Sequence, residues 1–203
     1  MGRIFYIMGK SSCGKDTIYR QLLGEGEFSF RTLVPYTTRP IRSGETDGKD
    51  YIFTDEKQLK RLSGQGRVIE LRSYHTVHGI WNYFTVDDGQ VDLARQNYLT
   101  VGTLESYAAM RRYFGEEALV PVYIEVEDGE RLQRALDRER AQKQPRYAEM
   151  CRRFLSDEED FSEEKLKEAS IRRRFQNSAL EGCLEEIREY IRGFLRRDAR
   201  TQG

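Results

Sequence analysis

A glycine-rich segment near the start of the sequence contains residue types that bind phosphate. It reads Gly-Lys-Ser-Ser-Cys-Gly-Lys-Asp-Thr, follows the apolar run Arg3–Met8 and precedes a helical pattern at Lys15–Leu23. This order of strand, loop and helix is the context that a phosphate-binding loop requires. Backbone N–H groups and the helix N-terminus attract an anion there, and the Lys15 ammonium adds a full charge for the β- and γ-phosphates of a nucleotide. The expected nucleotide-binding residues are Gly9, Lys10, Ser11, Ser12, Cys13, Gly14, Lys15, Asp16 and Thr17.

The usual phosphate-loop pattern, G-x-x-x-x-G-K-[ST], is broken at its last position. Asp16 stands where a hydroxyl normally meets Mg²⁺, and Thr17 follows it. Because a carboxylate beside phosphates is unfavourable unless a cation lies between them, we expect Asp16 to bind the metal directly or through water. The alternative interpretation is a glycine-rich turn that binds nothing. Lys15 and the helix start are also features that lower a thiol pKa, so Cys13 is a candidate for oxidative regulation.

A second group of phosphate-binding residue types lies at residues 36–53. Arg39 and Arg42 are three residues apart, with Pro40 between them, and Tyr51 follows in the run Gly-Lys-Asp-Tyr-Ile-Phe. Two guanidinium forks suit a dianionic phosphate, and a tyrosine hydroxyl can complete the cradle. Spacing alone favours the plainer interpretation of a solvated basic loop.

The elements that must position these groups alternate between strands and helices. Apolar runs at Arg3–Met8, Tyr98–Val101 and Leu119–Val126 are typical of buried strands. This alternation indicates an α/β fold with a parallel sheet. We further expect helices at Asp55–Leu62, Leu104–Tyr113, Asp128–Gln142, Ala148–Leu155 and Leu180–Leu195, strands of a small sheet at Arg67–Tyr74 and Gly79–Val86, and irregular structure at Tyr36–Lys49.

Composition excludes several classes of protein. The 203 residues hold 34 basic and 34 acidic side chains, and this balance argues against a protein held on nucleic acid by a general basic field. No apolar run approaches the length of about 18 residues that a transmembrane helix needs. The N-terminus lacks the features of a signal peptide. Three distant cysteines make no disulfide framework, so we expect a reduced, cytoplasmic chain without a membrane partner.

With these motifs in order, the chain resembles guanylate kinases. The phosphate loop, the stretch T-T-R-P-x-R-x-G-E-x-x-G-K-D-Y-x-F, Val68-Ile69-Glu70 and the late run Gln176–Leu180 follow the family's order over nearly the whole chain. The resemblance implies a single domain with a P-loop parallel sheet flanked by helices. It also implies a core (1–33, 87–127 and 161–203), a nucleoside-monophosphate-binding lobe (34–86) and a helical lid (128–160). The implied reaction transfers the γ-phosphoryl group of ATP, bound with Mg²⁺, to GMP.

The resemblance also implies roles for individual residues. Lys15 becomes the phosphate-loop lysine, and Glu70 the carboxylate that accepts hydrogen bonds from guanine N1–H and its exocyclic amine. His78 corresponds roughly to a second tyrosine of the phosphate clamp, and Thr100 and Thr103 stand near the place of two acidic residues. The implied GMP-binding residues are Arg39, Arg42, Tyr51, Glu70, His78, Thr100 and Thr103.

The lid is expected to bring positive charge to the transferred phosphoryl group when the site closes. It is rich in arginine, and solvated ion pairs along the helices are the plainer interpretation. The resemblance implies that Lys15 acts in catalysis together with Arg134, Arg138 and Arg153.

Some positions depart from the family pattern. Pro35 replaces a serine that contacts guanine, and Ile80 stands where a serine or threonine is expected. Two alternatives therefore stay open: a related P-loop kinase for another phosphorylated acceptor, similar to ribose 1,5-bisphosphate kinases, and a non-catalytic guanylate-kinase-like binding module. We expect the small-molecule substrates ATP and GMP, no nucleic-acid partner, and a monomer or homodimer.

Overall fold

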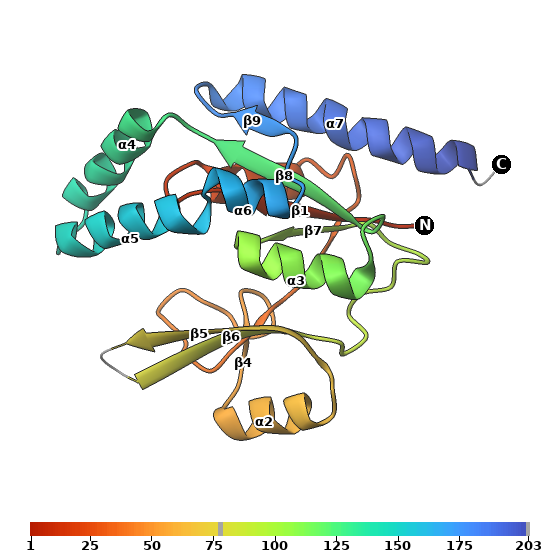
Figure 1. Ribbon diagram of the computed structural model, residues 1–203, viewed down its shortest axis with the longest axis horizontal. Coiled ribbons are helices and arrows are strands. Elements are labelled where there is room, and N and C mark those ends of the chain that lie inside the picture. Colours follow the sequence, from red (N-terminus) through yellow and green to blue (C-terminus); the bar gives the residue numbers. More distant parts are fainter. Residues whose placement is uncertain (77–78, 202–203) are drawn as a thin grey trace.

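The computed structural model describes residues 1–76 and 79–201, apart from the side chains of 199–201, and contains two sheets (Figure 1). The larger sheet has five strands in the order β2-β7-β1-β8-β9, and each neighbouring pair is parallel. This confirms the expected α/β class. The strands are β1 (Ile4–Met8), β2 (Arg31–Thr32), β7 (Tyr98–Val101), β8 (Leu119–Glu125) and β9 (Arg174–Gln176).

The central strand β1 is buried over its whole length because helices cover both faces of the sheet. Phe5 and Ile7 pack on one face against α1 (Lys15–Gly24) and α7 (Leu180–Thr201). Ile4 and Tyr6 pack on the other against α3 (Leu104–Phe114) and α6 (Glu163–Glu168). Figure 1 shows α7 above this sheet and α3 below it. The carboxyl ends of β1, β7 and β8 therefore meet at one edge, where parallel sheets carry their ligands.

The smaller sheet has four strands in the order β4-β3-β6-β5. One face is covered by α2, whose Leu59 and Leu62 pack against Phe84. Asp55 caps this helix as expected, because its side chain accepts a hydrogen bond from Gln58 N at 2.7 Å. The other face carries Glu70, Arg72 and Tyr83, and β5 also lies against α3. The elements are β3 (Tyr36–Thr37), β4 (Ile52–Phe53), α2 (Glu56–Gly64), β5 (Val68–Thr76) and β6 (Gly79–Val86).

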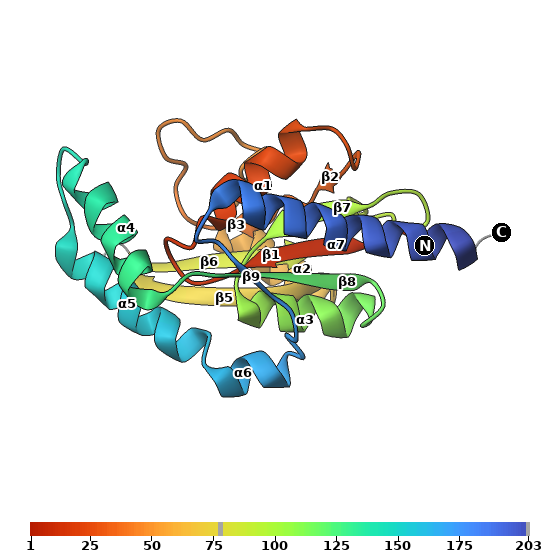
Figure 2. The same cartoon turned by 90° about the horizontal axis from the view of Figure 1, so that it is seen from above.

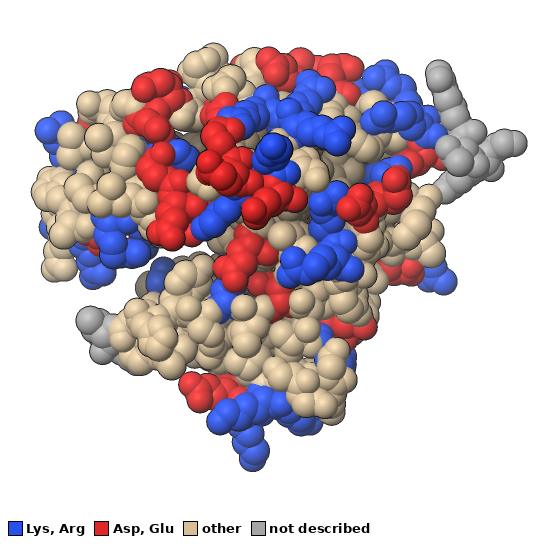
Figure 3. All heavy atoms as spheres, viewed as in Figure 1, with Lys and Arg blue, Asp and Glu red and all other residues tan. Residues whose placement is uncertain are grey.

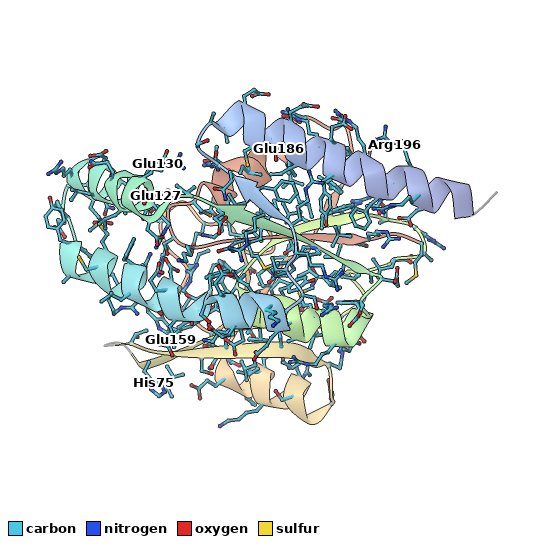
Figure 4. All side chains as sticks on the ribbon, turned by 45° about the horizontal axis from the view of Figure 1, so that its top comes forward. His75, Glu127, Glu130, Glu159, Glu186 and Arg196 are labelled. Atoms are coloured by element: carbon cyan, nitrogen blue, oxygen red, sulfur yellow. The ribbon has the colours of Figure 1, made fainter. Side chains whose placement is uncertain are left out.

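Two further helices project from the end of the larger sheet. Figure 2 shows α4 (Asp128–Arg140) and α5 (Tyr147–Asp160) side by side and beyond the sheet. The start of α4 is capped by Glu127, which accepts from Glu130 N at 2.9 Å (Figure 4). Helix α5 has no buried residue and is longer than the expected Ala148–Leu155. Because no side chain of α5 is buried, its apolar pattern does not mark where the helix begins and ends.

The sequence pattern did not predict the shortest strands. Strand β9 has three residues, of which Phe175 alone is buried, so no periodicity could reveal it. Strand β3 is a two-residue strand inside the segment expected to be irregular. In the part of the chain that the structure describes, no helix is both long and apolar enough to cross a membrane.

Candidate functional site

The loop between β1 and α1 packs too tightly to tolerate side chains at its two glycines. A Cβ at Gly9 would lie 2.4 Å from the carbonyl oxygen of Ile124 and 2.8 Å from Cys13 Sγ. Gly14 adopts φ +87°, and a Cβ there would lie 2.4 Å from Asn177 Nδ2. The Asn177 amide also donates to Cys13 O at 2.8 Å. Neighbouring β8 and the segment after β9 thus hold the loop in one shape.

The start of α1 is prepared for an anion. Its N-cap, Gly14, has no side chain to satisfy the first backbone N–H groups of the helix, which leaves them available to a ligand. Lys15 is half-buried at this point. Within residues 1–76 and 79–201, the Lys15 ammonium has no hydrogen bond or ion pair, so its charge is available to a phosphate.

The Cys13 thiol does not have the lowered pKa expected from the sequence. Cys13 is fully buried beneath the loop. Burial raises the pKa of its thiol, and the nearby Lys15 charge is too weak to reverse this. The prediction of a reactive thiol is therefore wrong, because local charge was visible in the sequence and packing was not.

Hydroxyl groups, not carboxylates, lie at the end of β7. Thr100 is buried, and Thr103 caps α3 by accepting from Ser106 N at 3.2 Å. Between them, a Cβ on Gly102 would lie 2.0 Å from the Tyr6 hydroxyl, which itself hydrogen-bonds Ser106. Tyr6 therefore occupies the space that an acidic side chain at position 102 would need. Asp16 is exposed in the first turn of α1.

The small sheet brings Arg39, Arg42 and Tyr51 together. Arg39 is 4% exposed and donates to both oxygens of Glu45, at 2.7 and 2.6 Å. Its guanidinium lies 4.8 Å from the Tyr51 ring centroid. The Arg42 backbone N–H donates to the same carboxylate at 2.8 Å, while its exposed side chain lies 5.8 Å from the Trp81 ring.

Glu45 is the carboxylate that the donors of this cluster hold. Hydrogen bonds from the Arg39 side chain, and then from the Arg42 backbone, lower the pKa of Glu45 to about 2. Arg39 Nε is buried and has no hydrogen-bond partner among the described residues. The cluster of Arg39, Arg42 and Tyr51, called the clamp below, therefore holds the Glu45 carboxylate and leaves one buried guanidinium N–H unpaired among the described residues.

Glu70 lies on the same sheet with its carboxylate almost completely buried. It accepts hydrogen bonds from Arg72 Nε at 2.9 Å and from Thr85 Oγ1 at 2.8 Å. The cross-strand register pairs Glu70 with Thr85 and Arg72 with Tyr83. Residues directly opposite each other share a face, so the sheet presents all four side chains together.

Sequence reasoning missed Tyr83 and Thr85. The Tyr83 ring lies 5.7 Å from the Tyr51 ring and 6.0 Å from the Arg39 guanidinium, so it belongs to the clamp. The expected residue His78 lies outside the described residues, and Ile80 is 46% exposed on the hairpin. Strand alternation counted back from the hairpin turn would have found Tyr83 and Thr85, but only with the length of that turn known.

The lid arginines fall into two groups. Arg138 and Arg153 line a hollow of about 680 Å³ together with Ser11 and Ser12 of the phosphate loop. Arg153 is paired with Glu149 at 2.8 Å. Arg134 instead donates to the backbone oxygen of Asn177 at 2.7 Å, next to the other side of the loop.

A cluster of charges joins α4 and α5 to the loop between β1 and α1. The buried Arg131 guanidinium contacts Asp128, Asp157 and Glu158 at 2.9, 3.2 and 2.6 Å. Lys10 Nζ also donates to Glu158, at 2.7 Å. On the face in Figure 3, acidic and basic side chains alternate over the helices of the upper part, whereas the β5–β6 hairpin is mostly uncharged. The expected ligand residue Lys10 is thus occupied by a lid carboxylate.

The parallel sheet, with β1 leading through this glycine loop into α1, defines a P-loop nucleotide-binding fold. Comparisons with known proteins support this fold. The family model described as guanylate kinase matches residues 1–192. The solved guanylate kinase from Anaplasma phagocytophilum superimposes with a TM-score of 0.63 at 20% identity, covering 95% of this chain and 85% of that one.

Curated relatives match over shorter segments. The guanylate kinase of Anaplasma phagocytophilum (strain HZ) is 39% identical over 70 residues, which is 34% of this chain and 33% of the relative. That of Streptococcus pneumoniae (strain ATCC BAA-255 / R6) is 34% identical over 83 residues, 41% of this chain and 38% of the relative. These matches therefore span little more than a third of each relative. The family model, in contrast, matches residues 1–192 of this chain, so the chain belongs to the guanylate kinase family.

Proposed function

We propose that this chain is a nucleoside monophosphate kinase that transfers the γ-phosphoryl group of ATP to GMP, giving ADP and GDP. The observation that carries the proposal is the phosphate loop, in which Gly9 and Gly14 leave no room for side chains and the Lys15 ammonium is unpaired among the described residues. Membership of the guanylate kinase family supports the choice of acceptor.

The donor and acceptor are assigned to different parts of the chain. Core residues 1–33, 87–127 and 161–203 bind ATP on the phosphate loop, residues 34–86 bind GMP, and residues 128–160 form the lid. In the acceptor lobe, Arg39, Arg42, Tyr51 and Tyr83 hold the GMP phosphate, and Glu70 faces the base. The unpartnered Nε of Arg39 supports this assignment because it is a buried donor beside the exposed Arg42.

Transfer requires positive charge around the moving phosphoryl group. We assign this role to Lys15, to Arg138 and Arg153, which line one hollow with the phosphate loop, and to Arg134 beside Asn177. A dianionic acceptor phosphate is already a nucleophile, so no general base is needed. The lid excludes water when it closes, which prevents hydrolysis of ATP.

The residues present fit a Mg²⁺ ion that arrives with ATP. Within the described part of the chain no group of three or more His, Cys, Asp or Glu side chains forms a metal cage. Mg²⁺ bound to a nucleotide needs only one or two protein ligands besides phosphates and water. The exposed Asp16 and the adjacent Thr17 would hold it. When bound, it neutralises charge on the phosphates.

The test is an ADP-release assay with ATP, Mg²⁺ and a panel of acceptors: GMP, dGMP, AMP, UMP, CMP and ribose 1,5-bisphosphate. We expect GMP to be the best acceptor. A preference for ribose 1,5-bisphosphate would establish the related-kinase alternative, and ATP binding without turnover of any acceptor would establish the binding module. The three free cysteines support a cytoplasmic location, and the choice of monomer or homodimer stays a prediction for size-exclusion measurements.

A further inference from the structure

The arginine that neutralises Glu70 has no role in the proposed transfer. Arg72 Nε donates to Glu70 Oε2 at 2.9 Å, and its Nη2 donates more weakly to Oε1 at 3.3 Å. The Arg72 and Glu70 side chains are 14% and 3% exposed. A carboxylate has about four lone-pair sites. Because Arg72 occupies two of them and Thr85 a third, Glu70 has room for about one further donor from a ligand.

Arg72 keeps donors of its own. A guanidinium has about five N–H groups, and the Glu70 carboxylate accepts from only two of its nitrogens. Among the described residues, Nη1 has no acceptor. Burial alone would lower the pKa of Arg72, but the Glu70 charge outweighs this and keeps the pKa above its ordinary value. The guanidinium therefore stays charged and has N–H groups to offer.

The pair lies where an acceptor base would be. Arg72 is the cross-strand neighbour of Tyr83, whose ring is part of the phosphate clamp. Arg72 also lines a hollow of about 930 Å³ with Tyr74 of β5, Thr103 at the start of α3 and Ser156 of α5. Neither Glu70 nor a clamp residue lines this hollow, but the Tyr74 ring, which does, lies 5.6 Å from the Tyr83 ring. The inference therefore places the acceptor base between the clamp and Arg72.

The pair matches one kind of purine edge. A 6-oxopurine offers the O6 acceptor next to the N1–H donor, whereas adenine offers an N6 amino donor next to an acceptor nitrogen. With the base in the same orientation, the Arg72 donor beside the Glu70 acceptor is complementary to the first arrangement and sets donor against donor and acceptor against acceptor in the second. Pro35 has no N–H and its side chain no donor, so Pro35 cannot read O6.

We propose that Arg72 is a specificity-determining residue that donates a hydrogen bond to O6 of the acceptor base while it orients Glu70 to accept from N1–H. The pair thereby selects 6-oxopurine monophosphates. This inference rests on the proposed function, because it assumes that a nucleoside monophosphate occupies the clamp.

The experiment compares wild type, Arg72→Ala and Arg72→Lys in steady-state kinetics with GMP, IMP and AMP, and in calorimetric binding of each acceptor without ATP. We expect Arg72→Ala to raise KM and Kd for GMP and IMP by about 10- to 100-fold, with a much smaller change in kcat. AMP should change little, so the preference for GMP over AMP collapses. Arg72→Lys keeps the charge at Glu70 but cannot serve both partners, so we expect an intermediate loss in a folded protein.

Arg111→Ala is the matched control, because Arg111 lines the same hollow but is paired with Glu116 at 2.8 Å. It should leave all three acceptors unchanged. If both Arg72 variants lower kcat/KM for GMP and AMP in the same proportion, or leave it unchanged, the inference is overturned and the proposed function stands. If wild type phosphorylates none of the three acceptors, both fall together.

Discussion

The Asp157 carboxylate of α5 accepts a hydrogen bond from the Ser11 backbone N–H at 2.8 Å. A carboxylate oxygen thus accepts from a loop N–H group of the kind that donates to phosphate oxygens at a helix N-terminus. The same carboxylate contacts Arg131 at 3.2 Å. In this arrangement α5 is tied to the loop between β1 and α1 by a carboxylate of the protein itself.

This contact predicts a competition between Asp157 and ATP. In Asp157→Asn the competing charge is lost, so we expect KM for ATP to fall about two- to fivefold, less than the tenfold that corresponds to 1.4 kcal/mol. Steady-state ADP release against ATP concentration measures it. Glu159→Gln is the control on the same helix, on an exposed side chain (Figure 4). An unchanged or higher KM for Asp157→Asn would show that the carboxylate does not compete with ATP.

Replacing Glu70 should damage acceptor selection. Glu70→Gln exchanges a charged acceptor for a mixed amide and weakens the bond from Arg72, so we expect kcat/KM for GMP to fall about 10- to 100-fold. Glu56→Gln, exposed in the first turn of α2, should behave like wild type. Acceptor kinetics on both variants provide the check. Full activity of Glu70→Gln with GMP would show that the Glu70 carboxylate does not bind the acceptor base.

The Arg131 cluster predicts a large effect on stability. Arg131 is 1% exposed and contacts three carboxylates. Removing its charge leaves the largely buried Asp157 without an ion-pair partner, while Lys10 still pairs with Glu158 and Asp128, so Arg131→Ala should lower the free energy of unfolding by about 2 kcal/mol. Arg140→Ala, at a side chain 62% exposed, should cost less than about 0.5 kcal/mol. Urea denaturation of both variants measures the difference, and equal midpoints would contradict the cluster's role.

The ion pair between Arg39 and Glu45 predicts a pH-dependent contribution to the free energy of unfolding. Hydrogen bonds from Arg39 lower the pKa of Glu45 from 4.5 to about 2. A carboxyl group with a lowered pKa in the folded state stabilises it above the unfolded pKa and loses this effect as pH falls through the folded one. The stability difference between wild type and Glu45→Gln should therefore be constant above about pH 5 and shrink toward pH 2. A difference that does not vary over this range would refute the ion pair.

Features encoded in consecutive residues could be predicted from the sequence. The phosphate loop around Gly9 and Lys15 is such a local motif, and its strand and helix lie where expected. The last helix also follows its periodic pattern, since Leu184, Ile187 and Ile191 are fully buried in the core.

Features that depend on contacts between distant segments could not be predicted. Tyr83 joins the clamp because the hairpin register places it opposite Arg72, and that register depends on the length of the turn. The Cys13 thiol is buried by elements far along the chain. The Tyr6 hydroxyl fills the space that a side chain at Gly102 would need, and only packing shows this.

The transfer of a labelled γ-phosphoryl group from ATP to GMP tests the central claim most directly. Wild type with Mg²⁺ should form labelled GDP. Lys15→Met should form it about 100- to 1,000-fold more slowly at unchanged thermal stability, because the Lys15 ammonium has no partner to lose within the described residues. No labelled GDP from wild type, or equal rates from the two proteins, would contradict the account.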